Sequence, residues 1–216
     1  FVMLILPSLS LGFDSSYVFI SSPLFDYKNP TFKNNQDPYN YESVEQILFE
    51  KHSGTSSEII VRNYNFNGDI SDYILVSNGA MNVNPSFTDN MAVWQSNKNG
   101  NWDLYYSVYD GASWSPPLIV DSTSSDETNP QIHFTGYVDI RCLVYKRDND
   151  IYFRRYWGGA WLPDTNITSG LSEDCFNPQL YGSGYNMSIF YLKELSPGNN
   201  EVIRQNLIID YPTYAV

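Results

Sequence analysis

Residues 84–120, NPSFTDNMAVWQSNKNGNWDLYYSVYDGASWSPPLIV, contain the signals of four short strands in succession. Asn84-Pro85 precedes a run that can form a first strand, and MAVW at 91–94 predicts a second strand that ends in an aromatic residue. A third strand begins with Asp103 after a connection rich in Asn, Gly and Ser, and residues 118–120 supply a fourth. β-branched and aromatic residues favour strands, whereas Gly, Asn and Ser favour the turns of hairpins. The stretch therefore predicts one four-stranded sheet.

The same order of signals recurs along the chain. Asn-Pro is found at residues 29, 84, 129 and 177. The strand MAVW, which ends in an aromatic residue, has an equivalent in each of the other repeats: QILF at 46–49, CLVY at 142–145 and SIFY at 188–191. An acid opens the third strand each time, as Glu58, Asp150 and Glu201. Pro suits the first residue of a strand, and the Asn side chain can bond local backbone, so we interpret the dipeptide as structural.

A sheet repeated at this period is typical of a β-propeller, in which sheets pack face to face around a central channel. A β-sandwich is the competing all-β fold, but it does not require the same strand signatures four times. We therefore predict an all-β chain, with residues 13–216 forming a β-propeller of about four four-stranded blades and repeats that start near residues 29, 84, 129 and 177.

The two ends of the repeat region are incomplete. Residues 15–30 are similar to residues 71–85, the outermost strand of the first unit with its exit loop, and the last unit lacks a fourth strand. Tyr17 to Ile20 could supply that strand and close the ring, which removes exposed sheet edges. Alternatively, the chain is a fragment of a propeller of six to eight blades. We favour a truncated or incomplete ring.

Residues 1–12 are treated separately. The apolar run VMLILPSLSL at 2–11 is typical of the middle of a secretory signal, and Ser10-Leu11-Gly12 has small residues at the spacing of a cleavage site, although a charged leader is lacking. The alternative is a strand of an upstream module. We expect a truncated signal peptide, and hence a secreted or envelope-associated protein.

Composition excludes several functions. The 216 residues carry 24 Asp plus Glu against 12 Lys plus Arg, a formal net charge of −12. Because nucleic-acid binding needs clustered basic residues to neutralise phosphates, this balance excludes a nucleic-acid partner. No apolar run reaches the ~18 residues that span a bilayer. The two cysteines, Cys142 and Cys175, are too few for a disulfide framework, and we expect free thiols.

One hairpin connects the chain to a known class of repeat. Ser107 to Trp114, SVYDGASW, is similar to the Asp box, Ser-x-Asp-x-Gly-x-x-Trp, with the Asp displaced by one residue. The chain thus resembles bacterial secreted propellers with sialidase-type Asp-box (BNR-like) or TolB-like repeats. The resemblance implies that Asp110 caps a turn and that Trp114 and Trp161 pack as scaffold between sheets. Sialidases also use an arginine trio and a Tyr-Glu pair; the arginines here match no family motif, so no catalytic residue is carried over.

The candidate ligand residues lie in loops that we expect to meet on one face of the disc, where propellers usually bind ligands. These residues are Asn97, Asn99, Trp102, Asp126, Glu127, Asp148, Glu173 and Asp174. Trp102 could stack on a sugar, and oxygen-rich loops could hold Ca²⁺, the one cofactor considered. Solvated loop acids and catalytic acids are the alternatives. His133 is interpreted as a hydrogen-bonded channel-wall residue.

The functional hypothesis is a non-catalytic propeller that binds a glycan or an extracellular protein through the loops around residues 97–101, 124–129, 146–149 and 172–177. The alternative is a divergent, sialidase-like glycoside hydrolase that uses the loop carboxylates, because such enzymes need two carboxylates facing one sugar.

Overall fold

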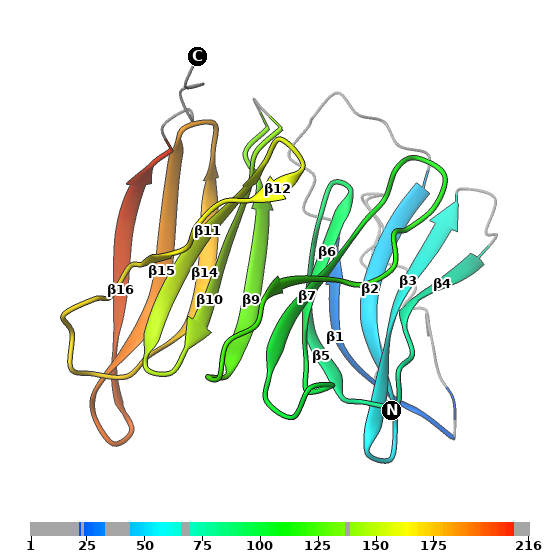
Figure 1. Cartoon of the computed structure of the whole chain (residues 1–216), viewed down its shortest axis with the longest axis horizontal. Helices are drawn as coiled ribbons and strands as arrows, with labels where there is room; N and C mark the ends of the chain where they lie inside the picture. The colour runs from blue at the N-terminus through cyan, green and yellow to red at the C-terminus, as the bar shows by residue number, and fades with distance from the viewer. Residues whose placement is uncertain (1–21, 23, 33–43, 66–69, 137–138, 210–216) are drawn as a thin grey trace, which may run out of the picture.

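The structure, a computed structural model, describes residues 22, 24–32, 44–65, 70–136 and 139–209 (Figure 1). This part of the chain consists of antiparallel β-sheets and their connections. Among these residues there is no helix long and apolar enough to cross a membrane. The chain is an all-β propeller, as the repeat predicts.

Each repeat forms its own sheet, and the strands follow chain order from the channel outward. The first sheet contains β1 (Asp26–Phe32), β2 (Val44–Ser53), β3 (Ser56–Asn65) and β4 (Ile70–Val76). The second contains β5 (Asn82–Thr88), β6 (Met91–Ser96), β7 (Asp103–Val108) and β8 (Leu118–Asp121). The third contains β9 (Glu127–Phe134), β10 (Arg141–Arg147), β11 (Asp150–Trp157), β12 (Ala160–Trp161) and β13 (Thr165–Asn166). The fourth contains β14 (Cys175–Ser183), β15 (Asn186–Ser196) and β16 (Asn199–Ile208).

The boundaries differ from the sequence prediction at two hairpins. In the first sheet β2 continues beyond Phe49 to Ser53 and β3 begins at Ser56, before Glu58, so the connection is only two residues long. In the fourth sheet β15 likewise runs to Ser196 and β16 begins at Asn199. The polar residues in these segments belong to the strands because their backbones still pair across the two hairpins. The proposed closing strand, Tyr17 to Ile20, and the expected signal segment, residues 1–12, lie outside the described residues.

Successive sheets pack through their faces, as Figure 1 shows. Every residue of β6 is buried, because Ala92 and Trp94 face the first sheet while Met91 and Val93 face the third. Cys142 packs with Met187 and Ile189 between the third and fourth sheets. Strands with two buried faces therefore read as continuous apolar runs instead of alternating ones. Within the described ranges, none of these clusters joins the fourth sheet to the first.

The residues singled out in the hairpin after β7 are scaffold. The carboxylate Oδ1 of Asp110 accepts hydrogen bonds from the backbone N–H groups of Ala112 and Ser113, both at 2.8 Å. Trp114 is buried against Phe87 and Tyr109. In the next repeat, Trp161 packs on Tyr106 of the second sheet and on Tyr156. Cys142 and Cys175 are free and buried, as predicted.

Candidate functional site at the propeller axis

The four Asn-Pro dipeptides lie inside the innermost strands rather than at their starts. β1, β5, β9 and β14 begin two or three residues before the Asn. Each dipeptide coincides with a shift in register against the second strand of its sheet. The prediction that Pro opens the strand is therefore wrong. A bulge interrupts the ladder of hydrogen bonds locally, so Pro, which has no N–H to donate, fits there within the strand.

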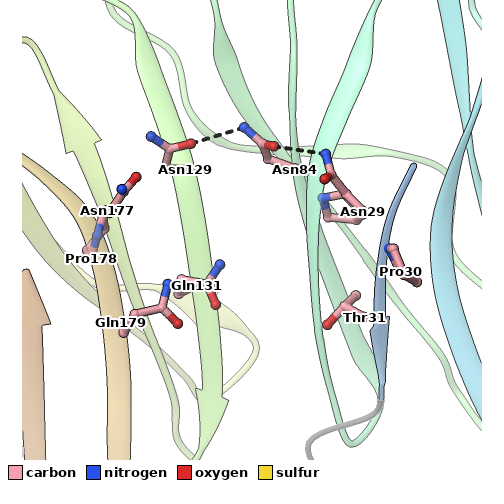
Figure 2. A pocket seen from close by; sticks show the side chains of 10 residues that line it. Asn29, Pro30, Thr31, Asn84, Asn129, Gln131, Asn177, Pro178 and Gln179 are labelled. Atoms are coloured by element: carbon pink, nitrogen blue, oxygen red, sulfur yellow. Dashed lines mark hydrogen bonds between the residues drawn. The ribbon is translucent and has the colours of Figure 1, made fainter. Parts of the chain in front are cut away.

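The asparagines have an unusual backbone conformation. Asn29, Asn84, Asn129 and Asn177 have φ angles of 46°, 52°, 53° and 52°. Asn is the non-glycine residue, with Asp, that most readily adopts this left-handed region. Bulges of this kind re-aim a side chain relative to the pleat. Here they direct one carboxamide from every sheet toward the space between the innermost strands (Figure 2).

The carboxamides link neighbouring sheets by hydrogen bonds. Asn29 Nδ2 donates to Asn84 Oδ1 at 3.3 Å, and Asn84 Nδ2 donates to Asn129 Oδ1 at 3.0 Å (Figure 2). The backbone N–H of Asn84 donates to Glu50 Oε1 at 2.6 Å, and that of Asn129 donates to Gln95 Oε1 at 2.8 Å. Glu50 and Gln95 occupy the same repeat position, directly after the aromatic residue of the second strand. In the first and second sheets, one side-chain acceptor therefore satisfies the bulged backbone of the next sheet.

The third sheet uses different chemistry at that position. Its residue is Lys146, whose ammonium group can only donate. Lys146 Nζ binds Asp174 Oδ1 at 2.5 Å, in the loop before β14. An ion pair at the edge of the channel thus replaces the amide contact between the third and fourth sheets.

The innermost strands enclose a cavity of about 360 Å³. Its lining residues are Asn29, Pro30, Thr31, Asn84, Pro85, Asn129, Gln131, Asn177, Pro178 and Gln179. A second cavity of about 370 Å³ shares Thr31, Gln131 and Gln179 with it and adds Phe32, Ser86, Phe87, Ile132 and Leu180. All of these lining residues are uncharged. The two cavities form an axial channel whose polar groups are amides and hydroxyls, with volumes at the lower end of those found for ligand sites.

The loops predicted to bind ligand do meet at one end of the molecule. Asp126 Oδ1 accepts the backbone N–H of Trp102 at 2.9 Å, and the backbone N–H of Glu127 donates to Trp102 O at 2.7 Å. Ser125 Oγ donates to Asp148 Oδ2 at 2.9 Å. The loop before β9 is thereby attached to the β6–β7 and β10–β11 connections.

Glu127 does not face solvent in this loop. Its side chain is fully buried and accepts hydrogen bonds from Thr123 Oγ1 at 2.5 Å and from Arg147 Nε at 3.1 Å. Burial raises the pKa of Glu127, and the neighbouring Asp121 charge adds to this, while the bond from Thr123 and the Arg147 charge oppose it. Arg147 also pairs with Asp121 and with Asp164, the latter at 2.7 Å. We did not single out Arg147 from the sequence.

The other predicted residues serve mainly local contacts. Asn97 Oδ1 accepts the backbone N–H of Met81 at 3.0 Å, and Asn99 Nδ2 donates to Asp103 Oδ2 at 2.9 Å. Asp174 pairs with Lys146, as described above. Glu173 is partly exposed, and hydrogen bonds from its own backbone and that of Ser172 lower its pKa.

Two further sequence predictions concern His133 and metals. His133 on β9 is buried, and its Nε2 lies 2.8 Å from Gly182 O, so the ring has a partner in the fourth sheet. Burial lowers the pKa of His133. Among the described residues, no group of three or more His, Cys, Asp or Glu side chains is placed to hold a metal ion. The channel asparagines and Gln131 and Gln179 were not among the predicted ligand residues; the repeated Asn-Pro was the signal for the asparagines.

Comparisons with known proteins support the architecture. No family model and no curated protein matches the chain. Among solved structures, it is similar to the sialidase of Trypanosoma rangeli, with a TM-score of 0.54, 13% identity, and coverage of 94% of this chain and 40% of the sialidase. A protein described as a glycoside hydrolase has a TM-score of 0.50 and 9% identity, covering 90% of this chain and 78% of its own. A GH43B protein of Bacteroides ovatus has 13% identity, a TM-score of 0.48 and coverage of 86% and 40%. The chain thus spans less than half of two of these proteins, and the likeness concerns the fold.

Proposed function

We propose that the chain is a non-catalytic propeller that binds an uncharged glycan at its axial channel. The observation that carries the proposal is the lining of that channel: neutral side chains from all four sheets, with carboxamides at two levels. Amides donate and accept hydrogen bonds, as sugar hydroxyls do. A neutral lining also avoids the cost of desolvating charges when a ligand excludes water.

An apolar surface accompanies these amides. Phe32 lines the second cavity and is 48% exposed, so part of its ring is available for contact. Aromatic rings combine large apolar area with a defined geometry, which suits the C–H face of a sugar ring. A recessed polar channel of this kind suits a sugar better than it suits the broad contact surface of an extracellular protein.

The loops at the end of the disc belong to the same proposal. Asn129 and Asn177 are the last residues of the loops around 124–129 and 172–177, and both also line the cavity. A ligand that extends from the channel would therefore reach those loops. Secretion or attachment to the cell envelope is part of the proposal, since glycans are abundant there. The names of the solved neighbours, a sialidase and a glycoside hydrolase, agree with a glycan as the ligand class.

The hydrolase alternative requires two carboxylates on opposite sides of one sugar. The residues that line the cavities include none, and the buried Glu127 is not among them and is paired with Arg147. These observations favour binding over hydrolysis.

The test is calorimetric titration of the purified chain with a panel of neutral oligosaccharides, compared with sialylated and uronic-acid oligosaccharides. Gln131→Leu and Gln179→Leu each remove a hydrogen bond to the glycan, and one such bond is worth about 0.5–1.5 kcal/mol. We therefore expect the Kd for the glycan to rise roughly 2- to 13-fold in each variant. Gln46→Leu is the matched control, because Gln46 bonds Asn63 on β3 and does not line the channel. Unchanged binding in both channel variants would overturn the proposed site.

The same samples decide between binding and catalysis. Intact oligosaccharide after prolonged incubation is expected from a binding module. Hydrolysis that is lost on Glu127→Gln or Asp174→Asn would instead establish the hydrolase.

A further inference from the structure

A second repeat position lies directly after Glu50, Gln95 and Lys146, and its side chain is on the opposite face of the strand. In three sheets it is basic and lies opposite the acid that opens the third strand: Lys51 opposite Glu58, Arg147 opposite Asp150, and Lys193 opposite Glu201. Lys51 Nζ is 2.9 Å from Glu58, and Lys193 Nζ is 3.3 Å from Glu201. In the second sheet Ser96 lies opposite Asp103. The acid is retained there, but the basic side chain is replaced by a hydroxyl.

Asn82, Ser96 and Asp103 are in register across β5, β6 and β7 and share one face of the sheet; we call them the Asp103 row. Their exposed fractions are 0%, 1% and 0%. Asp103 accepts hydrogen bonds from Asn99 Nδ2 at 2.9 Å and from Asn101 Nδ2 at 3.4 Å. In the described part of the chain no basic side chain pairs with it. The row therefore buries a carboxylate with neutral neighbours only.

Two oxygens of the row have no hydrogen-bond partner, Ser96 Oγ and Asn82 Oδ1. The orientation of the Asn82 amide is fixed, because Nδ2 donates to Ser57 O at 2.7 Å and to Asn78 Oδ1 at 2.9 Å. Buried polar atoms are almost always paired, because an unpaired one has lost its hydrogen bonds to water without replacement. Oxygens from three adjacent strands thus share one face, and two of them lack a partner.

We propose that the Asp103 row binds one monovalent metal cation, such as Na⁺, where the other sheets place a basic side chain. Carboxylate, amide and hydroxyl oxygens are ligands for hard cations. A buried carboxylate needs a counter-charge, and a single positive charge neutralises it. A divalent ion would leave an excess charge, and Ca²⁺ sites usually draw on more than one carboxylate. This inference is independent of the glycan proposal, because the row faces the first sheet and does not line the channel.

The test is thermal unfolding of the purified chain in NaCl, KCl and choline chloride at equal ionic strength. Binding to the folded state raises Tm, and for a chain of this size we expect a gain of about 2–4 °C in the favoured alkali salt relative to choline. Asp103→Asn removes the charge and should abolish the difference between salts. Glu58→Gln is the matched control, since it changes the equivalent acid of the first sheet, which already has Lys51.

Two further variants keep the test decisive if Asp103→Asn does not fold. Ser96→Ala removes one ligand and should weaken the salt response, measured as a several-fold higher midpoint of the Tm titration. Ser96→Lys restores the basic residue of the other sheets and should make Tm independent of salt identity. Equal Tm values in all three salts for the wild-type chain would mean that only water occupies the row. Stabilisation by millimolar CaCl₂ alone would overturn the assignment of a monovalent ion.

Discussion

The second strands of the second and third sheets differ at two adjacent positions, Gln95-Ser96 in β6 and Lys146-Arg147 in β10. In β6 the pair is neutral: Gln95 bonds the backbone of Asn129, and Ser96 lies beside Asp103. In β10 the pair is doubly positive, with Lys146 bound to Asp174 and Arg147 bound to Glu127, Asp121 and Asp164. Equivalent positions between neighbouring sheets are therefore occupied by neutral side chains in the second sheet and by ion-paired side chains in the third. The repeat conserves the backbone geometry while the chemistry of the contacts changes.

Of the variants that test this comparison, Arg147→Met is expected to cause the largest loss in the free energy of unfolding. The substitution leaves Glu127 buried without its cationic partner and removes the ion pairs to Asp121 and Asp164. Removing one partner from a buried ion pair costs about 3–5 kcal/mol. We expect a loss of this size in the free energy of unfolding, measured by urea denaturation.

Lys146→Met is the control at the adjacent position. Its partner Asp174 is 34% exposed, and pairs this close to solvent contribute about 0–1 kcal/mol. Equal losses for the two variants would show that the charged arrangement in β10 acts as one unit, and that Arg147 has no special role.

An intermediate effect is expected from Gln95→Leu in β6. The variant retains apolar volume but leaves the backbone N–H of Asn129 without its acceptor. A buried donor without a partner costs about 1–3 kcal/mol, which urea denaturation resolves. Gln46→Leu, outside the channel, serves as the matched amide replacement. An unchanged free energy of unfolding in Gln95→Leu would mean that the amide links in the channel do not stabilise the packing of the second and third sheets.

The smallest effect concerns pH and Glu127. Because burial raises its pKa in the folded state, the folded protein binds more protons than the unfolded chain between the ordinary value of 4.5 and the raised value. The stabilising contribution is thus complete below pH 4.5 and is lost as pH rises through the folded pKa. Glu127→Gln should flatten this part of the curve of unfolding free energy against pH, measured from pH 4 to 7. Parallel curves for the two proteins would contradict the raised pKa.

Much of the fold follows from the sequence, because propeller sheets repeat the same buried positions. The runs MAVW and CLVY are apolar throughout because both faces of these second strands are covered, and this regularity makes the repeat recognisable from the sequence. The strand ends were less predictable. In β15 and β2 the polar residues before the turn still pair, so composition alone does not separate strand from connection.

The candidate site was harder to predict from the sequence than the fold. The acids of the loops were recognised, but whether a carboxylate faces solvent depends on residues distant in the chain, as with Glu127 and Arg147, twenty positions apart. The asparagines were recognised as a repeat and interpreted as structural residues whose side chains bond local backbone. Their contacts across the axis depend on the left-handed backbone of the bulge, which is a property of the assembled sheets.

The placement of proline after each channel asparagine also bears on how the protein ages. Asparagine deamidates when the backbone nitrogen of the following residue attacks its side chain, and proline offers no N–H for that cyclisation. Asn29, Asn84, Asn129 and Asn177 are thus protected from conversion to aspartate, whereas Asn78 and Asn99 precede glycine, the sequence most prone to it. During long storage, new negative charge will accumulate in the surface turns first, and the channel will keep its neutral lining.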